Sequence, residues 1–191
     1  PPPPPAAPKA ADEPLPESVE EFDNFLETTV DKYVKLSKEI GGNVEKQAAE
    51  VSKGFLEQRK LVLIATKSKK PSDADLPPLF EPINKAVMAV MEIKDVNHND
   101  PNKNHLASVA DGIMLLGWIA VTNRPFKHVD EVAGSAQFYG NRVLKEYKEK
   151  DPKHVEWIQS FYAIFKDLSA LLKDHLPNGL PWNPQGGSVQ E

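Results

Sequence analysis

The stretch DPKHVEWIQSFYAIFKDLSALLKDH (Asp151–His175) decides the fold class of this chain. Its apolar residues recur three and four positions apart, which places them on one side of an α-helix. They are Val155, Ile158, Phe161, Tyr162, Phe165, Leu168 and Leu172. Asp151 and Pro152 are typical of a helix start, because aspartate can accept an amide hydrogen bond and proline suits the first helical position. The pattern predicts a long helix with a broad buried face.

Helical spacing recurs upstream of this stretch and predicts five further helices. Their expected ranges are Ser18–Ile40, Val44–Lys67, Ile83–Val96, Asn102–Trp118 and His128–Lys150. Alternating β-branched runs beside a tight turn, which signal strands, are almost absent. We therefore predict an all-α protein, a six-helix antiparallel bundle with short connections over residues 18–187.

Caps and breakers set the expected ends of these helices. Ser18 followed by Glu21 predicts a capping box at the first start, and Gly41-Gly42 predicts the first stop. Ser72 and the pair Asp100-Pro101 are expected to cap the third and fourth helices. Pro77, Pro78 and Pro82 predict a single turn and then a kink before Ile83.

Both ends of the chain are expected to be disordered. Residues 1–17 open with PPPPPAAPKAADEPLP, which has too little apolar surface to fold and favours polyproline II. This proline-rich N-terminal segment is interpreted as a linker, and the run Pro1–Pro5 is alternatively a ligand for profilin or an SH3 domain. Residues 188–191 are expected to form a short disordered tail. Because the chain begins at Pro1 and not at methionine, we expect a piece of a longer protein.

Composition narrows the function classes. A net charge of −5 argues against a nucleic-acid binder, and the absence of cysteine excludes disulfides and thiolate metal sites. No apolar stretch is long enough to cross a bilayer. The charge is also uneven: Arg59–Lys70 holds bases and no acid, whereas Asp12–Glu27 holds acids and no base. Such runs either steer an acidic partner or are ordinary solvated faces.

The sequence offers little for catalysis. His98, His105, His128, His154 and His175 each stand alone on an element or loop, and we expect solvent-facing or capping roles for them. No phosphate-binding glycine motif and no HExxH pattern occurs, so we predict neither an enzyme nor a cofactor. Asp111 is expected at the edge of the core. Trp118 and Trp157 are expected in the core, and Trp182 is expected either to seal one end of the bundle or to anchor a partner.

Two basic clusters remain as candidate binding sites. In AQFYGNRVLKEYK (Ala136–Lys148), helical spacing aligns Arg142, Lys145 and Lys148 into a ridge, with Phe138 and Leu144 toward the core. The second cluster surrounds SKKPSD (Ser68–Asp73). It consists of Lys67, Lys69 and Lys70 beside Pro71. Either cluster could simply solubilise its helix or complement a helix dipole.

Several motifs in one order carry a family resemblance. They are SVEEFDNFLETTV (Ser18–Val30), SKKPSD, LGWIAV (Leu116–Val121), AQFYGNRVLKEYK, DPKHVEWI (Asp151–Ile158) and NGLPWNPQGG (Asn178–Gly187). This order resembles the N-terminal helical domain of cyclase-associated proteins, which recycle actin monomers and also bind adenylyl cyclase. The resemblance implies a six-helix bundle without an active site, in the cytoplasm at the cortical actin cytoskeleton.

The resemblance also implies partners and site residues. Such a domain binds actin filaments decorated with cofilin and promotes severing and depolymerisation at pointed ends. The interface expected here has Lys67, Lys69, Lys70 and Pro71 as one edge and Tyr139, Asn141, Arg142, Lys145 and Lys148 as the other. Adenylyl cyclase binding is expected through a segment N-terminal to this chain, in a full-length protein that is oligomeric. The alternatives are a spacer between oligomerising and actin-monomer-binding modules, or a weak phosphoinositide-binding module that uses the same lysines.

Overall fold

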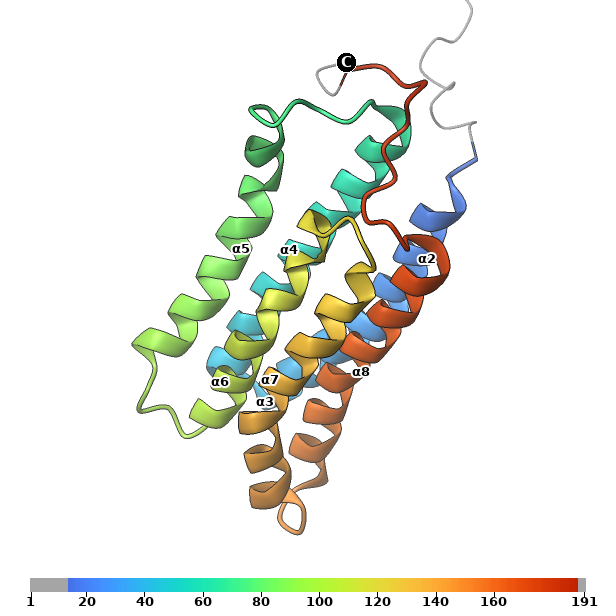
Figure 1. Cartoon of the computed structure of the whole chain (residues 1–191). Helices are drawn as coiled ribbons and strands as arrows, with labels where there is room; N and C mark the ends of the chain where they lie inside the picture. The colour runs from blue at the N-terminus through green and yellow to red at the C-terminus, as the bar shows by residue number, and fades with distance from the viewer. Residues whose placement is uncertain (1–13, 189–191) are drawn as a thin grey trace, which may run out of the picture.

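A computed structural model of the chain describes residues 14–188, and these residues form a bundle of helices (Figure 1). The elements, in chain order, are α2 (Glu17–Phe25), the π-helical turn η1 (Leu26–Val30), α3 (Asp31–Ile40), α4 (Gly42–Lys67), α5 (Leu76–Val96), α6 (Lys103–Gly112), the 3₁₀-helix η2 (Ile113–Ala120), α7 (Pro125–Tyr147) and α8 (Pro152–His175).

The elements join into six antiparallel rods, which confirms the predicted fold class. The first rod is α2, η1 and α3 in succession, and α6 continues directly into η2. α7 packs between α6 and α8, while α4 packs against both α3 and α5 (Figure 1). Of the predicted linker at residues 1–17, residues 1–13 lie outside the described residues and Glu17 already belongs to α2. Of the predicted tail at 188–191, residues 189–191 lie outside the described residues.

The apolar face of α8 forms the centre of the core, as its spacing predicts. Trp157 and Phe161 are fully buried, and the ring of Tyr33 on α3 lies 5.4 Å from that of Phe161. Trp118 on η2 is also fully buried, so the core positions predicted for both tryptophans are confirmed. Trp182 is half-buried and packs against the core, in agreement with a sealing role.

Buried amides connect the rods. The Trp118 indole donates a 2.9 Å hydrogen bond to the Gln58 side chain on α4, and the Gln58 amide donates to the carbonyl of Leu116 at 2.6 Å. The amide of Gln47, also on α4, donates to the carbonyls of Val90 on α5 and Leu106 on α6 at 3.2 and 3.0 Å. A buried polar group is costly unless it is paired, so these bonds allow one relative placement of the helices.

Three of the predicted helix starts are wrong. No capping box forms at Ser18, because α2 begins one residue earlier with Pro16 as its N-cap residue, and no side chain caps this helix. Ser72 does not cap α5, since its hydroxyl bonds the Asp75 side chain and Asp75 is the N-cap residue. Asp100 closes a turn by accepting from the Asn102 amide, and α6 begins at Lys103. The Asp151 cap is confirmed: its carboxylate accepts from the Lys153 amide at 3.0 Å.

The single turn expected before a helix start at Ile83 is not separate, because α5 runs as one helix from Leu76 with Pro82 inside it. Pro77 and Pro78 lie in the first turn, where backbone amides have no helical acceptor, so they remove no hydrogen bond. Pro82 removes one bond and leaves the rest of the ladder in place.

Two other boundaries differ from prediction. The fourth helix was expected to continue to Trp118, but the backbone tightens into η2 after Gly112. A side chain at Gly112 would meet the rings of Phe161 and Phe165, so α8 passes close to the chain at this point. The fifth helix begins at Pro125 and ends at Tyr147, three residues earlier at each end than predicted.

His105 of α6 and His154 of α8 form a pair that joins the two helices. A solvent-facing or capping role was expected for each, and for the buried His105 this prediction is wrong. His105 is buried, and its Nε2 lies 2.7 Å from Nδ1 of His154, whose ring stacks on Tyr147 at 3.9 Å. Burial, with a smaller contribution from His154, lowers the pKa of His105 to about 4, against a partly offsetting effect of Asp100. Burial is also the main cause that lowers the pKa of His154.

The histidine pair predicts a loss of stability in mild acid. Unfolded histidine titrates near pH 6.5, so the unfolded chain takes up a proton that His105 refuses in the folded state down to about pH 4. The stability that depends on neutral His105 is fully present above pH 6.5. The free energy of unfolding then falls as the pH is lowered to 4, by up to about 3 kcal/mol. Urea unfolding between pH 7 and 4.5 should show a weaker pH dependence for His105→Gln than for the unmodified chain. Equal slopes for the two proteins would contradict this prediction.

Candidate functional site

The first basic cluster lies at the C-terminal end of α4. Lys67, Lys69 and Lys70 are exposed, and Pro71 is half-buried. Their positive charge lies near the negative end of the α4 dipole, which favours it. The ammonium groups of Lys69 and Lys70 have no carboxylate within 4.0 Å among residues 14–188. The loop therefore presents cations to solvent.

The C-terminal tail holds this loop through its backbone. The Lys69 amide donates to the Gly187 carbonyl at 2.8 Å, and the Asn183 amide donates to the Ser68 carbonyl at 2.8 Å. The Gly187 amide donates in turn to the carbonyl of Lys67 at 3.2 Å, and Ser68 is 6% exposed. The lysine side chains thus project from a backbone that is fixed by bonds on either side of Ser68.

The second basic cluster lies on the C-terminal half of α7. Arg142, Lys145 and Lys148 are exposed, as the ridge predicts. Tyr139 is half-buried, and Asn141 is exposed and accepts a 3.1 Å hydrogen bond from the Tyr162 hydroxyl of α8.

One of the two apolar residues beside this ridge is not buried as predicted. Leu144 packs against the core as predicted, but Phe138 is 60% exposed and does not. Phe138 lies instead under the Arg142 guanidinium, whose carbon is 4.8 Å from the centre of the ring. An exposed aromatic ring beside a cation is therefore part of this surface.

The structure does not bring the two clusters together. α4 ends at the end of the bundle where the C-terminal tail passes, whereas the second half of α7 lies at the opposite end (Figure 1). With its 26 residues, α4 alone is about 39 Å long at a rise of 1.5 Å per residue. The two clusters therefore form separate surfaces of the bundle.

The uneven charge runs have a structural role in part. Arg59, from the basic run, makes a two-point contact with Asp23 of the acidic run at 2.8 and 3.0 Å. This hydrogen bond to the Asp23 carboxylate raises the pKa of Arg59. These two charges are half-buried and join α2 to α4.

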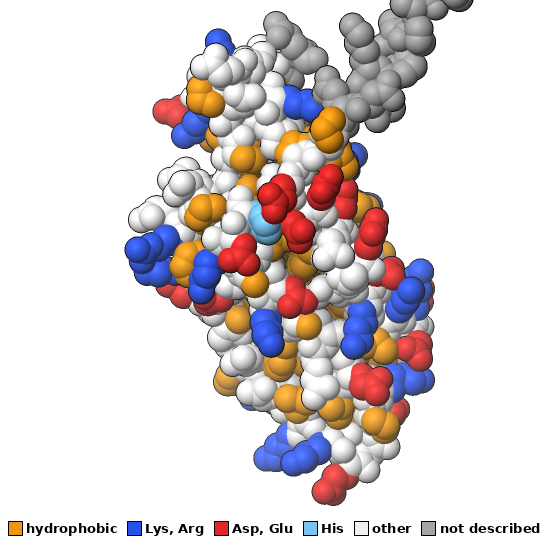
Figure 2. Space-filling model, turned by 90° about the vertical axis from the view of Figure 1, so that its right-hand side faces the viewer, with side chains coloured by type: hydrophobic (Ala, Val, Ile, Leu, Met, Phe, Trp, Pro, Cys, Tyr) orange, Lys and Arg blue, Asp and Glu red, His pale blue; other side chains and the backbone are white. Residues whose placement is uncertain are grey.

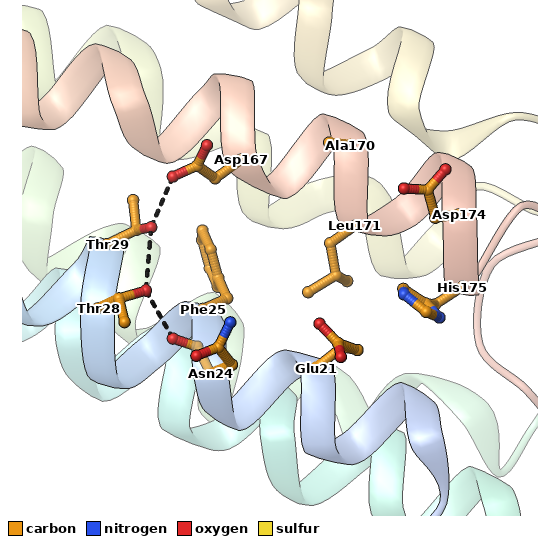
Figure 3. A pocket seen from close by; sticks show the side chains of 10 residues that line it. All are labelled: Glu21, Asn24, Phe25, Thr28, Thr29, Asp167, Ala170, Leu171, Asp174 and His175. Atoms are coloured by element: carbon orange, nitrogen blue, oxygen red, sulfur yellow. Dashed lines mark hydrogen bonds between the residues drawn. The ribbon is translucent and has the colours of Figure 1, made fainter.

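Other acids of the first run face α8 and form an acidic groove. Figure 2 shows acidic side chains gathered around a histidine on this face of the molecule. In Figure 3, Glu21 of α2 lies across from Asp174 and His175 of α8, and the Thr29 hydroxyl donates to Asp167 at 2.6 Å. The groove has a volume of about 230 Å³. The charge of this groove is opposite in sign to that of the two basic clusters.

The remaining groups with chemical potential are dispersed. Asp111 is half-buried at the core edge, where burial raises the pKa of its carboxyl and Lys94 opposes the shift. Within residues 14–188, no three histidine or carboxylate side chains lie together in a way that could hold a metal ion. No helix in the same range has the length and apolar character needed to span a membrane.

Sequence reasoning missed two features of these surfaces. The tail contact depends on Gly186, where a side chain would meet the Lys67 carbonyl, and only the glycine pair in the tail signals it. Lys94, His98 and Lys103 lie next to Arg142 in space, but they come from separate helices and a turn. No local pattern could have grouped them.

The architecture and its surface define the class: a helical bundle domain with separate charged surfaces. Residues 22–180 match the family profile described as "CAP, N-terminal domain", and the chain belongs to this family of cyclase-associated proteins. The chain is 38% identical to human adenylyl cyclase-associated protein 1 over 173 residues, which is 91% of this chain and 36% of that protein. It is 36% identical to the Schizosaccharomyces pombe adenylyl cyclase-associated protein over 183 residues. The chain thus spans about a third of the length of these relatives.

Solved structures support the same family. The N-terminal domain of the adenylyl cyclase-associated protein from Dictyostelium discoideum superposes with a TM-score of 0.88 at 35% identity. The match covers 91% of this chain and 98% of that one. A second structure of an N-terminal domain of CAP, whose description indicates variable oligomerisation, gives the same TM-score and identity. The helical bundle is therefore the fold of the family.

The tail contact predicts a specific sensitivity at Gly186. Gly186→Ala places a methyl group against the Lys67 carbonyl and the Ser68 amide, so the tail must separate from the loop. We expect a loss of about 1–3 kcal/mol in the free energy of unfolding, and faster hydrogen exchange at the Lys69 amide. Gly134→Ala is the matched control, because its methyl group meets nothing within 4 Å and should stabilise α7 by about 0.5–1 kcal/mol. Unchanged exchange at Lys69 in Gly186→Ala would show that the tail does not hold the loop.

Proposed function

We propose that this domain is an actin-turnover factor that binds cofilin-decorated actin filaments and promotes severing and pointed-end depolymerisation. The observation that carries the proposal is the first basic cluster, whose lysines project from a loop fixed by the C-terminal tail. Complementing the dipole of α4 would need only one or two cations. Three lysines on a loop whose backbone is bonded on both sides of Ser68 are more than that purpose requires. Membership of the cyclase-associated family directs the choice of partner.

The proposed action is mechanical. A domain that binds the strained terminal subunits of a filament better than relaxed ones shifts the equilibrium toward dissociation. This action needs a stiff body and charges that match an acidic partner, because complementary charge fixes orientation and speeds encounter. We assign Lys67, Lys69, Lys70 and Pro71 to one contact, and Tyr139, Asn141, Arg142, Lys145 and Lys148 to the other. Their separation suits a partner made of several subunits.

Further partners are proposed for the whole protein. Curated relatives are named for association with adenylyl cyclase, and we propose that this link uses a segment N-terminal to this chain. We also propose an oligomeric full-length protein at the cortical actin cytoskeleton, with Pro1–Pro5 as a ligand for profilin or an SH3 domain. A pure spacer role is the alternative, and weak phosphoinositide binding by the same lysines is a further one.

The proposal predicts that Lys69→Ala combined with Lys70→Ala strongly reduces activity without unfolding the domain. Both side chains are exposed, so helical content and melting temperature should not change. Loss of two interface cations should slow cofilin-dependent filament shortening by about tenfold. The assay follows single fluorescent filaments in a flow cell, with cofilin and with or without the chain.

A matched control distinguishes the loss of these two positions from the loss of two positive charges in general. Lys38→Ala combined with Lys46→Ala removes the same charge from exposed positions near the other end of α4 and should keep full activity. Equal losses in the two double variants would point to a general charge effect. Normal shortening with Lys69→Ala and Lys70→Ala would exclude the first cluster from the interface.

A further inference from the structure

A surface pocket of about 290 Å³ opens where the end of α5, the start of α6 and the middle of α7 meet. Side chains of separate elements line it: Lys94, His98, Lys103, Asn104, Tyr139 and Arg142. Three of these carry a permanent positive charge, and none is a carboxylate. The pocket is small beside typical cofactor sites, so it suits one side chain or a small anion.

The cations in the pocket are only partly neutralised. The Lys94 ammonium lies 3.3 Å from the exposed carboxylate of Asp95. Neither Lys103 nor Arg142 has a carboxylate within 4.0 Å among residues 14–188. Two cations at the pocket therefore lack a counter-charge in the described part of the chain.

The Arg142 guanidinium is positioned before any partner arrives. Its central carbon lies 4.8 Å from the centre of the Phe138 ring and 5.1 Å from that of Tyr139. Contact with an aromatic face holds a guanidinium by cation–π attraction, while its N–H groups remain able to donate in the plane. Binding then costs less side-chain entropy than it would for a freely rotating arginine.

The neighbourhood favours a protein as the source of the anion. Phe138 is 60% exposed at the edge of this surface, and a large exposed aromatic beside an arginine is typical of a protein-binding anchor. Asp95 and Asp111 lie close to Lys94, so an extended anionic surface such as a membrane would meet these carboxylates as well as the pocket.

We infer that this pocket receives an aspartate or glutamate side chain from an exposed segment of a protein partner, with an adjacent apolar residue packed on Phe138. The carboxylate accepts hydrogen bonds from the Arg142 guanidinium and the Lys103 ammonium. The inference deepens the proposed function and rests on it in one respect, since Tyr139 and Arg142 also belong to the second basic cluster. It shifts the centre of that contact from the outer ridge toward Lys94 and Lys103.

The test uses the ¹⁵N-labelled 191-residue chain and two short peptides. The probe is acetyl-Gly-Ile-Asp-Glu-Gly-amide, and its neutral partner replaces the acids with Asn and Gln. We expect the acidic peptide to shift the amide signals of Lys103, Ala107, Tyr139 and Arg142, and the neutral peptide to leave them unchanged. Arg142→Gln should weaken binding by about tenfold. Lys150→Gln is the matched control: it makes the same charge change at an exposed position outside the pocket and outside both basic clusters, and it should not weaken binding.

Other outcomes overturn the inference. Larger shifts with inorganic phosphate, or with vesicles containing phosphatidylinositol bisphosphate, would assign the pocket to a phosphate or a lipid instead of a carboxylate. An equal loss of peptide binding in Lys150→Gln would show that the peptide responds to net charge and not to the pocket. No shift with the acidic peptide at millimolar concentration, in a chain that still accelerates filament shortening, would refute the pocket and leave the proposed function intact. Conversely, peptide binding in a chain without filament activity would support the pocket and refute the proposed function.

Discussion

Aromatic side chains of α8 fit against glycines of two neighbouring helices, and the rest of the structure depends on this close contact. A side chain at Gly112 would collide with Phe161 and Phe165, and one at Gly140 would collide with the Tyr162 hydroxyl and approach Ser108. The constraint therefore fixes both the distance and the register of α6 and α7 relative to α8. Dense packing of this kind leaves few alternative arrangements.

The same contact places the candidate site. Gly140 lies between Tyr139 and Asn141, so the approach of α8 determines which way this part of α7 faces. Tyr162 completes the arrangement by donating to Asn141 across the interface. Buried amides of Gln47 and Gln58 then fix α4 against α5, α6 and η2, and the C-terminal tail fixes the end of α4. The result is a rigid body with cations at both ends and an acidic groove along one side.

Much of the fold was predictable because apolar periodicity is a local signal. The α8 stripe, the stop at Gly41 and the Asp151 cap depend on residues within a few positions of one another, and all were predicted. The capping box at Ser18 was wrong because α2 begins one residue before Ser18. The separate turn before Ile83 was wrong because α5 holds Pro77 and Pro78 in its first turn and Pro82 inside the helix. The switch to the 3₁₀ geometry of η2 comes directly after Gly112, where Phe161 and Phe165 of α8 lie close to the chain, and local sequence does not show that approach.

The features of the candidate surfaces were likewise predictable only where they depend on neighbouring residues. The exposed cations at Lys69, Lys70 and Arg142 follow from charge and spacing alone. The pairing of His105 with His154, the tail contact at Lys69 and the pocket around Lys103 join residues that are far apart in the chain. Phe138 shows the limit of periodicity, because its position on α7 suggested burial and the neighbouring helices do not reach it.

The central claim is that a stiff bundle contacts an actin filament through two separate basic surfaces at its opposite ends. Electron cryomicroscopy of cofilin-decorated filament ends with this chain bound tests the claim most directly. The account predicts that the loop at Lys69–Lys70 and the α7 surface at Tyr139–Arg142 both face filament subunits, with the helices arranged as in the free domain. Density that places the acidic groove of α2 and α8 against the filament, or that engages neither basic surface, would contradict it.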